Sequence, residues 1–125
     1  MKPAAPEPAR RLVIADDEPL ARERLRRLMQ HHPDWTVVGE ATTGPETVAL
    51  VERVRPDVVL LDIRLPGLGG FEVVESLKGP NRPAIIFVTA CDDRAVEAFG
   101  TGAIDYLVKP FEAGRLSEEI GRAHV

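Results

Sequence analysis

Residues 58–70 read VVLLDIRLPGLGG, in which four apolar residues are followed directly by Asp62 and then by a turn rich in glycine. A second run of this kind, AIIFV at 84–88, ends at Thr89. Strands that are apolar on both faces are typical of the centre of a parallel sheet that helices cover on both sides. These two runs therefore predict an α/β fold.

The rest of the chain alternates between short apolar runs and stretches with helical spacing. Further strands are expected at 12–15, 36–39 and 103–108. Five stretches of helical spacing follow the strands, and the residues expected on their buried faces are Leu20, Ala21, Leu25, Leu28, Met29, Thr47, Val48, Val51, Val54, Phe71, Val74, Leu77, Ala95, Val96, Ala98, Phe99, Leu116, Ile120 and Ala123. Right-handed crossovers then give a doubly wound, three-layer (βα)5 sandwich of the flavodoxin-like class, with a parallel sheet in the strand order 2-1-3-4-5.

The composition limits the function classes. The 125 residues suit one domain, and 44% hydrophobic with 29% charged residues is typical of a globular protein. A single cysteine excludes an internal disulfide, and a formal net charge of −4 argues against nucleic-acid binding by this domain. There is no membrane-spanning or secretory pattern, so a cytoplasmic protein is expected. Residues 1–10 are expected to form a flexible leader before one domain at 11–125, with no room for a second.

Polar side chains follow four of the predicted strands at their carboxyl ends. They are Asp16, Asp17, Glu18, Asp62, Thr89 and Lys109. The carboxyl ends of parallel strands meet at one edge of the sheet, so these side chains are expected to share a cleft. Clustered carboxylates repel one another unless a cation neutralises them. Oxygen ligands without a set of His or Cys residues favour Mg²⁺ or Mn²⁺. A carboxylate beside such an ion can attack phosphorus, while a Lys and a Thr stabilise the transferred group. The site is therefore predicted to form an aspartyl phosphate.

Four segments together resemble the receiver domain of bacterial two-component response regulators, over nearly all of residues 11–122. They are IADDE at 14–18, LLDIRLPGLGG at 60–70, VTA at 88–90 and DYLVKPF at 105–111. The resemblance implies that Asp62 is the phospho-acceptor for a sensor histidine kinase. It implies further that Asp16 and Asp17 hold Mg²⁺ with Asp62 and the backbone carbonyl of Arg64, that Thr89 binds the phosphoryl group and that Lys109 pairs with it.

The same resemblance implies a conformational switch. Tyr106 would change rotamer with Thr89, and the peptide bond between Lys109 and Pro110 would be cis. Phosphorylation would alter the surface that controls an output domain or carries self-association, formed by residues 95–100, 103–108 and 113–123. A domain of this kind catalyses its own phosphorylation and dephosphorylation but is not an enzyme that turns over a metabolite.

A narrower resemblance, in residues 16–29 and 88–111, is to the receivers of LytTR-type transcription factors. In that group a β-rich DNA-binding domain follows the receiver, and no such domain is expected in this chain. Arg64 and Cys91 stand at positions that vary in the family and influence how long the aspartyl phosphate lasts.

Three other functions fit the pattern less well. A hydrolase of the haloacid dehalogenase type needs a second Asp two residues after the nucleophile, where this chain has Arg64. A pseudo-receiver that is not phosphorylated would not need the intact set of site residues. A flavodoxin-like cofactor binder needs a polar loop for the FMN phosphate after the first strand, and the loop here does not provide one.

Several of these residues also have purely structural interpretations. Asp16 and Asp17 would suit the start of a helix, and Tyr106 would suit packing alone. Cys91 is expected to be a semi-buried packing residue, and Trp35 to pack at the start of an edge strand. A basic run interrupted by Glu23 is expected to be a solvated helix face; its members are Arg22, Arg24, Arg26 and Arg27.

Overall fold

The computed structural model describes residues 10–77, 79–80, 82–91 and 93–123, and within them five parallel strands form one sheet in the order β2-β1-β3-β4-β5. The strands are β1 (Arg10–Ala15), β2 (Trp35–Ala41), β3 (Val58–Leu61), β4 (Ala84–Thr89) and β5 (Asp105–Val108). The helices that alternate with them are α1 (Pro19–Met29), α2 (Gly44–Val54), α3 (Gly70–Ser76), α4 (Ala95–Gly100) and α5 (Ala113–Ala123). The predicted doubly wound fold and its strand order are confirmed.

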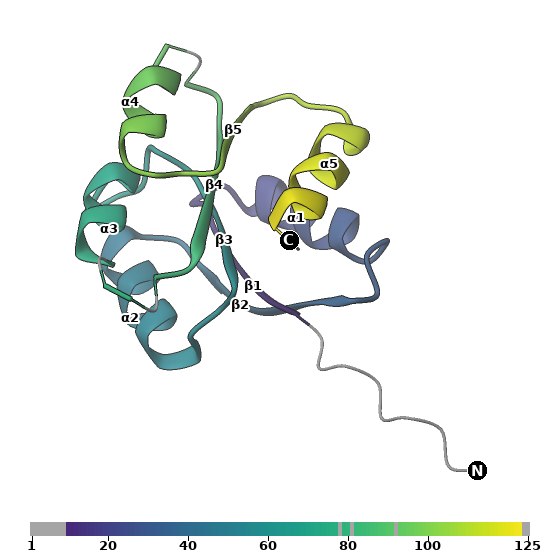
Figure 1. Cartoon of the computed structure of the whole chain (residues 1–125), viewed down its shortest axis with the longest axis horizontal. Coiled ribbons are helices and arrows are strands. Elements are labelled where there is room, and N and C mark those ends of the chain that lie inside the picture. Colours follow the sequence, from purple (N-terminus) through teal and green to yellow (C-terminus); the bar gives the residue numbers. More distant parts are fainter. Residues whose placement is uncertain (1–9, 78, 81, 92, 124–125) are drawn as a thin grey trace.

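Helices cover both faces of the sheet, with α1 and α5 on one side and α2, α3 and α4 on the other (Figure 1). Successive side chains of a strand point to opposite faces, so each central strand supplies two cores. Leu61 and Phe87 pack in the core beneath α2, α3 and α4, whereas Leu60 and Ile86 pack beneath α1 and α5. This double burial explains why β3 is apolar at every position and β4 is apolar up to Thr89, its last residue.

The second helix shows how local sequence sets the helix ends. The Thr43 hydroxyl accepts a hydrogen bond from the Glu46 amide at 3.1 Å, and the Glu46 carboxylate accepts one from the Thr42 amide at 2.9 Å. These two contacts satisfy amides that have no partner inside the helix. At the other end Arg55 adopts a left-handed conformation with φ 47°, which stops α2 before Pro56. None of the described helices is long and apolar enough to cross a membrane.

Two residues predicted for buried helix faces are exposed. Leu20 is 78% exposed because it lies in the first turn of α1, and the helix buries Leu25 and Met29 further along. Phe99 is 50% exposed because its neighbour Ala98 takes the buried position of α4, and a helix turns by about 100° per residue.

The boundary of the predicted leader is also different. β1 begins at Arg10, whose amide donates to the Asp34 carbonyl at 2.9 Å. The rest of that leader, residues 1–9, lies outside the described residues, as do the side chains of Val96 and Ala123.

A buried charge cluster joins α5 to β5. Glu119 of α5 is 0% exposed, and Arg115 and Arg122 each place Nη1 3.2 Å from its Oε1. Arg122 Nη1 also lies 2.6 Å from Asp105 Oδ2. Burial and the neighbouring Asp105 carboxylate raise the pKa of Glu119 to about 7.

This raised pKa makes the folding stability depend on pH. Because the folded state holds a proton on Glu119 that the unfolded state releases near its ordinary pKa of 4.5, stabilisation by that proton is complete below pH 4.5 and is lost as the pH rises through about 7. We expect Glu119→Gln to raise the free energy of unfolding at pH 8 by on the order of 1 kcal/mol and to change it little at pH 4.5. Urea unfolding at both pH values measures this, and the exposed neighbour variant Glu118→Gln is the control. An equal effect of Glu119→Gln at both pH values would contradict the assignment.

Candidate functional site

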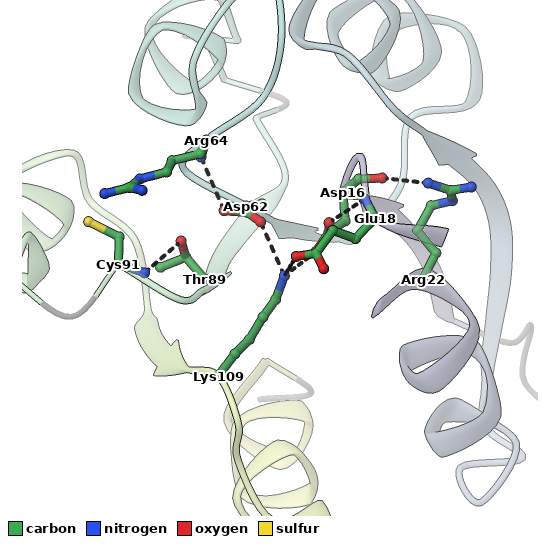
Figure 2. Close-up of polar contacts among 8 residues, drawn as sticks. All are labelled: Asp16, Glu18, Arg22, Asp62, Arg64, Thr89, Cys91 and Lys109. Carbon is green, nitrogen blue, oxygen red and sulfur yellow. Dashed lines mark hydrogen bonds and ion pairs between the residues drawn. The ribbon is translucent and has the colours of Figure 1, made fainter. Parts of the chain in front are cut away.

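Four strands deliver the predicted site residues to the carboxyl edge of the sheet (Figure 2). Asp16 follows β1, Asp62 follows β3, Thr89 ends β4 and Lys109 follows β5. Strand-like hydrogen bonds continue past the strand ends, since the Asp62 amide donates to the Ala15 carbonyl at 3.0 Å and the Lys109 amide to the Thr89 carbonyl at 2.9 Å. The backbone of the sheet therefore places these side chains.

The predicted metal ligands Asp16, Asp17 and Asp62 come together. One carboxylate oxygen from each lies within 4.8 Å of the other two. Asp16 and Asp62 are buried and Asp17 is exposed, so the cluster is open to solvent on one side. A set of hard oxygen donors with an open side fits Mg²⁺, which keeps several waters and takes one or two carboxylates. The fourth predicted ligand, the Arg64 carbonyl, stays a prediction.

Lys109 joins the two buried carboxylates. Its Nζ lies 2.5 Å from Asp16 Oδ2 and 3.1 Å from Asp62 Oδ2. Burial lowers the pKa of Lys109, but the hydrogen bond to Asp16 and the charges of Asp62 and Asp16 outweigh it and raise the pKa. Burial also raises the pKa of Asp16, despite the hydrogen bonds from Lys109 and the Glu18 amide. The ammonium group thus offsets the repulsion between the carboxylates. The peptide bond from Lys109 to Pro110 is cis.

Thr89 and Tyr106 are connected through one residue. Thr89 Oγ1 accepts a hydrogen bond from the Cys91 amide at 3.2 Å, and the Tyr106 hydroxyl donates to the Cys91 carbonyl. Tyr106 is buried against Phe87, with ring centroids 6.3 Å apart, and burial with the proximity of Cys91 raises its pKa to about 12. The Cys91 side chain is itself buried, and its thiol donates to Asp93 Oδ1 at 3.1 Å. A displacement of Thr89 would therefore reach Tyr106 through the backbone of Cys91.

Gly70 allows α3 to begin directly against the segment that carries Asp62. A Cβ atom at this position would lie 2.6 Å from the Asp62 carbonyl oxygen and 2.8 Å from the Ile63 Cα. The Gly70 amide donates to the Ile63 carbonyl at 2.7 Å, so the start of the helix clamps the segment in place. Only glycine permits so close an approach.

Arg22 contacts the site although the sequence predicted a solvated position for it. Its Nη1 donates to the Asp16 carbonyl at 2.9 Å, and Figure 2 shows the side chain reaching from α1 to this atom. The sequence offers no signal that separates Arg22 from the other arginines of the run, because all of them suit a charged helix face. By contrast, Arg27 pairs with Glu23 on the exposed surface, as expected.

The response regulator receiver domain family matches residues 12–121 of the chain. The chain belongs to this family. The receiver domain is also similar in sequence to the transcriptional regulatory protein BtsR of Escherichia coli strain K12, with 44% identity over 112 residues that cover 90% of this chain and 47% of BtsR. It is 46% identical over 114 residues to the positive alginate biosynthesis regulatory protein of Pseudomonas aeruginosa, covering 90% of this chain and 46% of that protein.

A solved structure gives the same fold for the receiver domain. The crystal structure of the response regulatory domain of protein mrkE from Klebsiella pneumoniae superposes with a TM-score of 0.85 at 30% identity, covering 91% of this chain and 94% of that one. The chain spans about half the length of these two regulatory proteins.

Proposed function

We propose that this receiver domain is a phosphorylation-dependent signalling switch in which Asp62 accepts a phosphoryl group from a sensor histidine kinase. The observation that carries the proposal is the placement of the Asp62 carboxylate, with Lys109 Nζ at 3.1 Å and with Asp16 and Asp17 oxygens within 4.8 Å. A carboxylate held between an ammonium group and a metal-binding cluster is suited to attack phosphorus.

The proposed reaction is a transfer of the phosphoryl group from the kinase histidine to Asp62. An oxygen of Asp62 forms a bond to phosphorus as the bond from phosphorus to the kinase histidine nitrogen breaks, and the imidazole leaves with that electron pair. Bound Mg²⁺ would neutralise charge on the phosphoryl oxygens. Lys109 lies close enough to balance charge on the same group. Thr89 Oγ1 accepts a hydrogen bond from the Cys91 amide, so the Thr89 hydroxyl can still donate its own hydrogen to a phosphoryl oxygen.

The site favours a switch over a hydrolase that turns over a metabolite. The position two residues after Asp62 is Arg64, which has no carboxyl group to serve as a general acid and base. The Arg64 amide instead donates to Asp62 Oδ1 at 3.1 Å. We therefore assign to this domain only its own phosphorylation and dephosphorylation.

We further propose that the domain controls a LytTR-type DNA-binding output domain in the cytoplasm. Two kinds of observation support this: the resemblance of residues 16–29 and 88–111 to LytTR-type receivers, and the similarity to two relatives that are named as transcriptional or biosynthesis regulators. The net charge of −4 supports DNA contact by the output domain and not by the receiver.

The proposed output surface is formed by α4, β5 and α5. Phe99 of α4 and Val108 of β5 are exposed apolar side chains, and so is Ile104, which directly precedes β5. Apolar side chains that gather on one face are typical of interaction sites. We propose that this surface carries self-association or output-domain contact, because Tyr106 of β5 lies in it and is linked to Thr89.

Binding of a phosphoryl mimic is expected to change the output surface. If the mimic draws Thr89 towards Asp62, the Cys91 carbonyl moves and the Tyr106 hydroxyl loses its partner, so the ring position differs between the two states. Backbone amide shifts, recorded with and without beryllofluoride and Mg²⁺, should therefore change at residues 95–108 as well as near Asp62. Thr89→Ala is expected to keep the changes near Asp62 and to lose those at 95–108. Changes confined to the loops around Asp62 in the unsubstituted domain would contradict the switch.

A further inference from the structure

One side chain on α1 connects the acidic loop to the neighbouring strand. Arg22 Nη1 donates to the Asp16 carbonyl at 2.9 Å, and Arg22 Nε lies 3.4 Å from Glu40 Oε1 on β2. The Arg22 side chain is only 19% exposed, so solvent screens these contacts less than those of an arginine at the surface. A guanidinium presents donors in a rigid fork, which lets one group serve two acceptors at once.

Glu40 is itself held in place. Arg26 Nη1 lies 2.9 Å from Glu40 Oε2 and 3.2 Å from Glu40 Oε1, so two arginines of α1 share this carboxylate. The exposed Arg26 thereby limits the positions that Glu40 can take, and Glu40 in turn orients the Arg22 guanidinium.

The peptide group that joins Asp16 to Asp17 is therefore fixed by elements outside the loop. The Asp16 amide donates to the Ala41 carbonyl of β2 at 3.0 Å, and the Asp16 carbonyl accepts from Arg22. That carbonyl belongs to the peptide plane that leads into Asp17. The Asp17 side chain is exposed and so depends on this backbone for its direction.

We propose that Arg22, oriented by Glu40, is a positioning residue that holds the peptide between Asp16 and Asp17 so that the carboxylates converge with Asp62 on a divalent cation. The inference deepens the proposed function and rests on its metal site. Groups that orient metal ligands without touching the metal commonly change metal affinity by about tenfold or more when they are removed.

The test measures Mg²⁺ binding to the whole chain by titration with MgCl₂ alone, followed through backbone amide shifts at residues 15–18 and 62–64. We expect Arg22→Gln to raise the Mg²⁺ dissociation constant about tenfold. Arg22→Lys keeps the positive charge, but an ammonium group cannot reach the Asp16 carbonyl and the Glu40 carboxylate at once as the planar guanidinium does. It should therefore restore little of the Mg²⁺ affinity. Glu40→Gln should weaken binding by a smaller factor. Arg27→Gln, which breaks the exposed pair with Glu23 on the same helix, should leave the affinity unchanged.

Urea unfolding of each variant separates positioning from general stability. If Arg22→Gln does not fold, the Mg²⁺ affinity of Glu40→Gln tests the inference, and wild-type affinity in that variant would overturn it. Wild-type Mg²⁺ affinity in Arg22→Gln would overturn the inference. Wild-type Mg²⁺ affinity in Arg22→Lys would also overturn it, because it would show that charge alone suffices. Both results would leave the proposed function intact. If the unsubstituted domain binds no Mg²⁺, both the metal site and this inference are wrong.

Discussion

Asp62→Asn is expected to abolish incorporation of a phosphoryl group from acetyl phosphate in the presence of Mg²⁺. The amide has nearly the same shape as the carboxylate, although its single oxygen can replace only one of the two acceptors that Lys109 and the Arg64 amide now contact at 3.1 Å, which are different oxygens of Asp62. An amide oxygen is a poor nucleophile and forms no stable acyl phosphate, so the loss should be complete while the fold is retained. Intact mass spectrometry should show one added phosphoryl group on the unsubstituted domain and none on the variant.

Asp57→Asn is the matched control for this experiment. Asp57 lies at the amino end of β3, and its Oδ2 accepts a hydrogen bond from the Arg11 amide at 2.7 Å, which an asparagine carbonyl can replace. This variant should be phosphorylated like the unsubstituted domain. Equal labelling of Asp62→Asn and the unsubstituted domain would show that another residue is the acceptor.

Removal of divalent cations with EDTA is expected to stop phosphorylation almost completely. Three carboxylates lie within reach of one another, and Lys109 supplies one positive charge to the buried pair. An incoming phosphoryl donor is itself an anion, so without a divalent cation its approach to Asp62 is opposed by net negative charge. Labelling followed by intact mass should fall to background in EDTA and recover when excess Mg²⁺ is added.

Asp17→Ala tests the same point without a chelator. Asp17 is exposed, so its removal leaves the packing of the core unchanged and takes away one of the three oxygen ligands. We expect labelling at limiting Mg²⁺ to fall by at least about tenfold, with partial recovery at high Mg²⁺. Glu18→Ala, which removes an exposed carboxylate 3.7 Å from Lys109, is the control and should have a small effect. Undiminished labelling in EDTA would contradict a metal-dependent site.

The central strands and the ends of α2 could be predicted because local signals specify them. β3 covers Val58–Leu61, the four residues of the predicted run, since Pro56 precedes it and Asp62 ends its apolar pattern. The other strands differ at their ends. β5 begins at Asp105 and not at residue 103, because strand bounds depend on which backbone groups find a partner.

The contacts around the site were less predictable than its residue types. Arg22 and Arg27 have the same side chain on the same helix, yet only Arg22 reaches the Asp16 carbonyl. Glu119 belongs to a helix whose charged residues are otherwise exposed in the described part, and it is fully buried because Asp105, Arg115 and Arg122 surround it. Both outcomes depend on the neighbours that other elements bring, which periodicity does not encode.

The sequence by itself determined the layer order, the parallel sheet and the residues at the strand ends, because burial on two faces and the alternation of periods are local properties of the chain. Only the tertiary structure decided how those residues meet. Lys109 comes within 3.1 Å of two carboxylates that precede it by 93 and 47 positions. Arg22 of α1 contacts both the Asp16 carbonyl and Glu40 of β2, a strand that follows it in the sequence. Such contacts depend on the order of the strands in the sheet and on the handedness of the crossover connections. These two features bring distant residues within the range of ion pairs and hydrogen bonds.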